Sequence, residues 1–148
     1  MARAALPACH FDRDKLIIRA EIAVSADPSS ISAVVNAVLA IASEMKCAAG
    51  KEFEIETALR EALANAIMHG CKNDPTKQVQ CCVACDQERG MILVVRDPGQ
   101  GFEPTSIPSP VVGQNLYAEP GRGIYLINQL MDEVSYERGG TEIHMRKN

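Results

Sequence analysis

Residues 53–70 read FEIETALREALANAIMHG, and this stretch decides the fold. Its apolar residues recur every three or four positions, which is the spacing of one face of an α-helix. They are Ile55, Leu59, Leu63, Ala66 and Ile67. Because an apolar stripe of this length is buried against a core, we expect a helix over 53–70 that docks on another layer of the same domain.

A line of polar residues runs beside that stripe. Glu61, Asn65 and His69 are four residues apart, so at about 100° per residue they lie along one edge of the docked helix. A solvated flank is the simpler interpretation of this helix alone. Asn65 favours a functional interpretation, because asparagine is a mediocre helix former that competes for backbone hydrogen bonds.

The remaining elements follow outward from this helix. Alternating and β-branched runs predict strands, and the other apolar periodicities predict helices. We expect strands at 15–24, 78–85, 91–96, 133–137 and 141–145, and helices at 29–48 and 123–131. This order of elements predicts an α+β fold, a two-layer α/β sandwich with a mixed or antiparallel sheet and helices on one face.

Two segments lack a regular period. Residues 102–120 contain four prolines, and a stretch this long inside a compact domain is typical of a functional lid. Residues 1–12 look like a loose N-terminal arm, which leaves 13–148 as a single domain.

Composition narrows the classes of function. The chain has 148 residues, 47% of them apolar, and a formal net charge of −4, which argues against a generic nucleic-acid binder because such proteins carry a basic excess. No apolar run approaches the roughly 20 residues that a membrane span requires, and residues 1–10 contain no convincing signal-peptide core. We therefore expect a cytoplasmic protein.

Six cysteines raise the question of a metal or redox site. Cys82 and Cys85 have the spacing of a metal-binding pair, but on a strand they would point to opposite faces. No second pair follows at zinc-site spacing. We expect reduced, structural cysteines, with Cys9, Cys47 and Cys71 isolated.

A glycine turn follows the strand that ends at Arg96. It reads Asp97-Pro98-Gly99-Gln100-Gly101. An aspartate at a strand end can aim its carboxylate into a pocket, where it accepts a hydrogen bond from an amino group such as that of adenine. The glycines let the main chain approach a ligand closely. An ordinary surface turn has the same chemistry, so the motif is ambiguous by itself.

A second glycine turn, Gly121-Arg122-Gly123, opens a helix. Free N–H groups at a helix N-terminus bind anions such as phosphates, and Arg122 could add charge. A simple helix-start loop explains this turn equally well when it is taken alone.

The order of these motifs resembles that of a known family. A Glu-x-x-x-Asn helix, an Asp-x-Gly-x-Gly turn, a lid and a glycine turn are similar to the GHKL ATPases (gyrase, Hsp90, histidine kinases, MutL), which share the Bergerat nucleotide-binding fold. The stretch 61–70 and the short chain look most like the bacterial anti-sigma factor serine kinases of the RsbW and SpoIIAB type. The resemblance covers about 15–145.

That resemblance implies roles for individual residues. It implies that Asn65 ligates Mg²⁺, that Glu61 orients or deprotonates the attacking hydroxyl, and that His69 lies near the phosphates. It implies that Asp97, with Gly99 and Gly101, binds the adenine amine of ATP, and that Thr141 supports the adenine. It further implies that Gly121, Arg122 and Gly123 hold phosphates.

The implied function is an anti-sigma factor with protein serine kinase activity. Its partners would be an antagonist protein as substrate and a sigma factor, with no direct contact to nucleic acid or membrane, and the protein would be a homodimer. The alternative is a non-catalytic ATP-binding module that only captures a partner. The ATPase half of a sensor histidine kinase fits less well, because the chain has no room for a helical hairpin with a phospho-acceptor histidine. Pro98 and Phe102 depart from the family pattern without removing a required donor.

Overall fold

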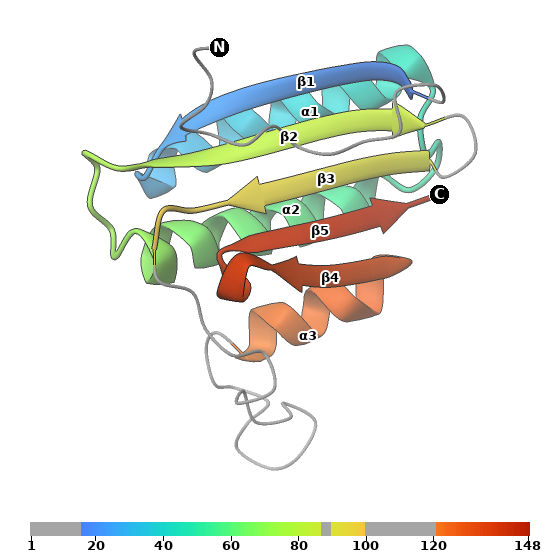
Figure 1. The fold of residues 1–148 in the computed structure, drawn as a ribbon. Coiled ribbons are helices and arrows are strands. Elements are labelled where there is room, and N and C mark those ends of the chain that lie inside the picture. The colour runs from blue at the N-terminus through green and yellow to red at the C-terminus, as the bar shows by residue number, and fades with distance from the viewer. Residues whose placement is uncertain (1–15, 87–89, 100–120) are drawn as a thin grey trace.

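The computed structural model describes residues 16–86, 90–99 and 121–148. Five strands form one sheet in the order β1-β2-β3-β5-β4, and every neighbouring pair is antiparallel. Three helices lie side by side on one face of this sheet, with α2 between α1 and α3 (Figure 1). The strands are β1 Leu16–Ser25, β2 Gln78–Asp86, β3 Gly90–Arg96, β4 Glu133–Glu137 and β5 Glu142–Lys147. The helices are α1 Ile31–Met45, α2 Glu52–Asn65 and α3 Gly121–Leu130. The α+β sandwich is confirmed, and its sheet is wholly antiparallel.

The central helix α2 forms as the apolar stripe predicts. Its buried residues are Ile55, Ala58, Leu59, Ala62 and Leu63. The helix continues as a π-helical segment, Ala66–Gly70, in which the Cys71 N–H donates to the Ala66 carbonyl at 2.8 Å. Single π-turns of this kind occur often at functional sites.

The sheet separates its side chains by face. On β2, Val79, Cys81, Val83 and Cys85 belong to the main core with the helices, whereas Cys82 forms a separate cluster with Val94. The prediction that Cys82 and Cys85 point to opposite faces is therefore confirmed. The side chains of Arg96 and Glu142 form a buried ion pair, with 3.5 Å between Nη1 and Oε2.

The expectation of reduced cysteines was wrong for Cys47, Cys82 and Cys85, which are disulfide-bonded. Cys47 is joined to Cys85 by a disulfide, with 6.1 Å between the Cα atoms. Lys46 and Ala48, on either side of Cys47, both have left-handed backbone with φ of 57° and 50°. These two residues turn the chain after α1 back toward the end of β2, a local reversal that helical periodicity does not reveal. Cys71 and Cys81 are buried free thiols, and Cys9 lies outside the described residues.

The predicted bounds of the first helix and the expected lack of a membrane span need smaller corrections. Helix α1 ends at Met45 instead of Ala48, because Lys46 adopts left-handed backbone. The expected arm (1–12) and lid (102–120) lie outside the described residues. By length and composition alone the segment Pro28–Met45 could cross a membrane, although α1 contributes Val34, Val35, Val38 and Ala42 to the protein core. The absence of a membrane contact stays a prediction.

Candidate functional site

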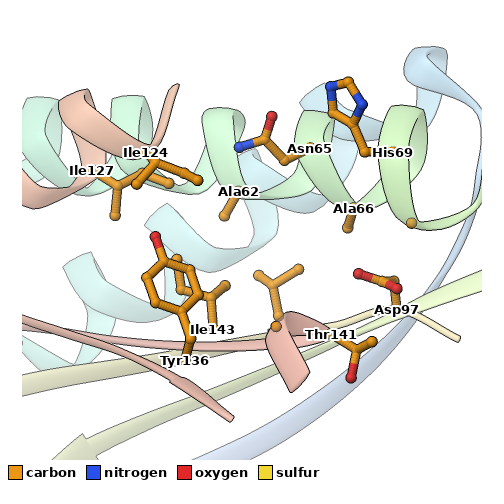
Figure 2. Close-up of a pocket in the computed structure, with 13 residues that line it drawn as sticks. Ala62, Asn65, Ala66, His69, Asp97, Ile124, Ile127, Tyr136, Thr141 and Ile143 are labelled. Carbon is orange, nitrogen blue, oxygen red and sulfur yellow. The ribbon is translucent and has the colours of Figure 1, made fainter. Parts of the chain in front are cut away.

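A cavity of about 220 Å³ opens between the helical layer and the sheet. Helix α2 and its π-helical extension form its upper side, the ends of β3 and β5 form its lower side, and α3 and β4 close one end (Figure 2). Asn65, His69, Asp97 and Thr141 all line this one cavity. Residues that are 76 positions apart in the sequence, Asn65 and Thr141, therefore meet at the same site.

The helical side carries small and polar residues in alternation. Ala62 and Ala66 point toward the sheet, whereas Asn65 and His69 lie on the outer edge of the same helix (Figure 2). The alanines leave space that larger side chains would fill. The polar pair then lines the rim of the cavity, and His69 is exposed there.

Asp97 is fixed by the sheet. The ladder between β3 and β5 continues one residue beyond Arg96, since the Asp97 N–H donates to the Thr141 carbonyl at 2.9 Å. The Gly99 N–H donates to Asp97 Oδ1 at 2.7 Å. Burial raises the pKa of the Asp97 carboxyl above its ordinary value, and the hydrogen bond from Gly99 partly opposes this by favouring the charged form.

Two glycines pack against the Asp97 carboxylate. A Cβ atom on Gly70 would overlap the carboxylate itself, and a Cβ atom on Gly99 would overlap the Gly70 carbonyl oxygen. The end of the π-helical segment and the turn after β3 are therefore in direct backbone contact. Neither side could carry a larger residue without a shift of Asp97 or of the main chain.

Glu61 lies one helical turn before Asn65, next to α3. A Cβ atom on Gly123 would stand 2.7 Å from Glu61 Oε1 and 3.2 Å from Asn65 Nδ2. The first turn of α3 thus runs directly over the Glu61 and Asn65 side chains. The predicted helix start and the predicted polar line meet here.

The rest of the lining is apolar. It comes from Val95, Ile124, Ile127, Tyr136 and Ile143. Burial raises the pKa of the Tyr136 hydroxyl to about 12, so this side chain stays neutral at physiological pH. A planar apolar group fits between such walls while Asp97 supplies one charged acceptor, which is the composition expected of a small-molecule site.

Some of the predicted site residues do not line this cavity. Gly99 lines a neighbouring hollow on the other side of Asp97. Gly121 and Arg122 are the first residues of α3, and Gly101 lies outside the described residues. The roles of all these residues toward a ligand stay predictions.

Sequence reasoning missed several lining residues. Ala62 and Ala66 are four apart on the helix edge next to Asn65, and this spacing of small residues could have marked the cavity. Tyr136 and Ile143 carried no signal, because apolar strand residues are ordinarily core. Gly70 was quoted only as part of a motif, although its contact with Asp97 is among the closest at the site.

The metal chemistry of the site is limited by its donors. Across residues 16–86, 90–99 and 121–148, no group of three His, Cys, Asp or Glu side chains could hold a metal ion. Asn65 offers one hard carboxamide oxygen at the cavity. Mg²⁺ usually keeps several waters and binds through few protein ligands together with substrate phosphates, so one such donor is compatible with a Mg²⁺–nucleotide complex.

An antiparallel sheet with helices on one face and a half-buried aspartate at a strand end is consistent with a nucleotide-binding ATPase domain of the Bergerat fold. The sequence model of the family described as "Histidine kinase-like ATPase domain" matches residues 24–147. This chain belongs to that family.

Three bacterial proteins are similar to this chain over much of its length. The chain is 28% identical over 136 residues to the "Serine-protein kinase RsbW" of Bacillus subtilis (strain 168), covering 86% of this chain and 83% of the relative. It is 33% identical over 105 residues to the "Anti-sigma F factor" of Geobacillus stearothermophilus, covering 64% and 67%. It is 30% identical over 118 residues to the "Anti-sigma F factor" of Clostridium novyi (strain NT), covering 75% and 80%.

Proposed function

We propose that this protein is an anti-sigma factor with ATP-dependent protein serine kinase activity. The observation that carries the proposal is the convergence of Asn65, His69, Asp97 and Thr141 on one cavity, with Glu61 beside its helical end. The names of the relatives, a serine-protein kinase and anti-sigma F factors, support the same function.

ATP would enter with its adenine between the helical layer and the sheet. The Asp97 carboxylate, held by the Gly99 N–H at 2.7 Å, would accept the hydrogen bond from the adenine amino group. The hydroxyl of Thr141 donates to the Arg138 carbonyl at 2.9 Å, which fixes the turn that borders the base. Burial of the ring against the isoleucines contributes affinity, and the carboxylate contributes selectivity.

The phosphates would lie toward α3. Its N-terminal N–H groups, from Gly121 onward, favour anions, and Arg122 would add positive charge. Mg²⁺ would be held by Asn65 together with phosphate oxygens and water, and it would neutralise phosphate charge. His69, at the exposed rim, would contact the phosphates from the other side.

Glu61 would act on the incoming serine hydroxyl of the antagonist protein. Phosphoryl transfer depends mainly on positioning and charge stabilisation, with a carboxylate to orient the hydroxyl and accept its proton. A protein that merely bound ATP would have no use for a carboxylate beside phosphates, because the like charges repel. The position of Glu61 next to Asn65 therefore favours a kinase over a partner-capture module.

We propose a cytoplasmic homodimer whose partners are a sigma factor and its antagonist, without direct contact to nucleic acid or membrane. Light scattering on the purified protein tests the dimer, and a monomer at micromolar concentration would contradict it.

The decisive experiment is phosphate transfer from labelled ATP to a panel of antagonist proteins. Glu61→Gln should leave ATP affinity within about threefold and reduce transfer by about 10²-fold or more, the range for loss of a general base. Glu54→Gln is the matched control, since it lies on the same face of α2 two turns further from the cavity, and it should transfer at the wild-type rate. Retained transfer in Glu61→Gln would remove Glu61 from the mechanism. ATP binding with sigma-factor capture but without transfer by the wild type would favour the capture module.

A further inference from the structure

The backbone conformation at position 70 does not require a glycine. Gly70 is the last residue of the π-helical segment Ala66–Gly70, and it is not among the glycines with positive φ in the described part of the chain, which are Gly50, Gly90, Gly139 and Gly140. In helical backbone alanine is more favourable than glycine. The reason for a glycine at this position must therefore be space.

The space belongs to Asp97. The three atoms nearest to a Cβ on Gly70 are Cγ, Oδ1 and Oδ2 of Asp97, and all three would overlap it. No other residue is among these three contacts. An added methyl group would therefore act first on the carboxylate.

The Asp97 carboxylate can move aside only by giving up the contacts that hold it in place. Oδ1 accepts the Gly99 N–H at 2.7 Å, and the Asp97 backbone is tied to Thr141 at 2.9 Å. On the far side, a Cβ on Gly99 would stand 2.9 Å from Oδ1 and 3.0 Å from the Cα of Gly70. Asp97 thus lies in a slot between two glycines, one of which supplies room and the other a hydrogen bond.

We propose that Gly70 is a positioning residue that sets the adenine selectivity of the site by leaving room for the Asp97 carboxylate. The inference rests on the proposed function, in which Asp97 accepts the adenine amino group. A methyl at position 70 displaces the carboxylate, so the amino group loses its acceptor while the apolar walls and the phosphate contacts remain. Selectivity among purine nucleotides falls, and the general capacity to bind a triphosphate stays.

Inosine triphosphate is the probe for this selectivity, because its ring carries an oxygen where adenine carries the amino group. We expect the wild type to prefer ATP by about ten- to a hundredfold, the usual value of a hydrogen bond to a charged group. Binding of ATP and inosine triphosphate is measured for the wild type, Gly70→Ala, Asp97→Ala and the double variant. Gly70→Ala should lower the ratio of affinities to within about threefold of the Asp97→Ala ratio, and the double variant should match Asp97→Ala, since the clash is gone.

Gly50→Ala is the control. Gly50 has a φ of +85°, and a Cβ atom at this position would have no atom within 4 Å, so its substitution strains the backbone without touching the site. The ATP preference of Gly50→Ala should equal that of the wild type, even where its melting temperature falls.

The possible outcomes distinguish the adenine role of Asp97 from the positioning role of Gly70. If Asp97→Ala keeps the wild-type preference for ATP, the adenine role of Asp97 in the proposed function fails. If Asp97→Ala loses the preference while Gly70→Ala keeps it, the positioning role of Gly70 is overturned and the proposed function stands. If Gly70→Ala does not fold, folding of the double variant supports the clash with Asp97, and failure of the double variant contradicts it.

Discussion

The two ends of the cavity are built from different parts of the fold. At the sheet end, lined by Gly70, Asp97 and Thr141, the Asp97 carboxylate is held by main-chain hydrogen bonds, one of them from Gly99 behind it, and by backbone contact. At the helix end, Asn65 lines the cavity with Glu61 beside it, and both side chains lie under the first turn of α3 at Gly123. A rigid end suits recognition of an unchanging base, whereas an end built between two helices allows the phosphates and an acceptor to be arranged together.

The contrast predicts that damage at the helix end reduces catalysis more than binding. Gly123→Ala places a Cβ 2.7 Å from Glu61 Oε1 and 3.2 Å from Asn65 Nδ2, so both side chains must shift. Because misplacement of a catalytic group by about 1 Å can cost about 10²-fold in rate, we expect phosphate transfer to fall about a hundredfold. Transfer kinetics at saturating ATP measure this. An unchanged rate constant would mean that Glu61 has room to adapt.

The Cys47–Cys85 disulfide lies far from both ends of the cavity, so its removal should affect stability alone. The disulfide Cys47–Cys85 joins residues 38 positions apart at the end of β2 opposite Gln78, and a cross-link over such a loop stabilises by about 2–4 kcal/mol. Cys47→Ala should lower the free energy of unfolding by about 2 kcal/mol, measured by urea titration under oxidising conditions, with ATP affinity unchanged.

The response to reductant provides the control for this bridge. Cys81→Ala removes a buried free thiol and keeps the bridge, so it should lose stability on reduction as the wild type does. Cys47→Ala, which lacks the Cys47–Cys85 bridge, should lose less stability on reduction than the wild type, although Cys82 is disulfide-bonded in both. A wild type whose stability does not change with reductant would contradict the bridge.

At the sheet end, the sequence predicted the individual elements, but it did not predict how they contact one another. Periodicity located α2, and the turn after β3 identified Asp97, because both signals are local. The contact of Gly70 with Asp97 could not be predicted, since it depends on how the end of a helix meets a strand 27 residues further along the chain. The Cys47–Cys85 bridge escaped for the same reason, because two left-handed residues in a loop leave no periodic signal.

The helix end was predicted as two separate motifs. The spacing of Glu61 and Asn65 placed both on one helix edge, and the glycines at 121 and 123 predicted a helix start. Only the packing of α3 against α2 brings Gly123 onto these side chains. Ala62 and Ala66 were not recognised as lining residues, because alanine is ordinary in a helix and their four-residue spacing beside Asn65 is only a weak signal of a cavity.

The smallest expected effect tests whether the sheet end sacrifices stability for recognition. Burial raises the pKa of Asp97 from its ordinary value of 3.8, so the folded state disfavours the charged carboxylate. The stability contributed by the protonated form is present below the unfolded pKa and is lost as the pH rises through the folded pKa. At neutral pH the charged wild type therefore carries a penalty that Asp97→Asn avoids. Asparagine keeps an oxygen for the Gly99 N–H.

We therefore expect Asp97→Asn to melt slightly higher than the wild type at pH 7 without nucleotide, while its ATP affinity falls about tenfold, since the charged acceptor is lost. The gap in melting temperature should narrow as the pH falls through the folded pKa of Asp97, because the wild-type carboxyl then becomes neutral, as the carboxamide already is. Melting scans from about pH 4 to 8 and ATP titrations at pH 7 measure both. Asp132→Asn provides the opposite sign, because a backbone hydrogen bond from Asn148 and the charges of Lys147 and Arg146 lower the pKa of that exposed carboxyl. A higher melting temperature for the wild type than for Asp97→Asn at every pH would show that the Asp97 carboxylate stabilises the fold, and the contrast between a recognition end and a catalytic end would lose its energetic basis.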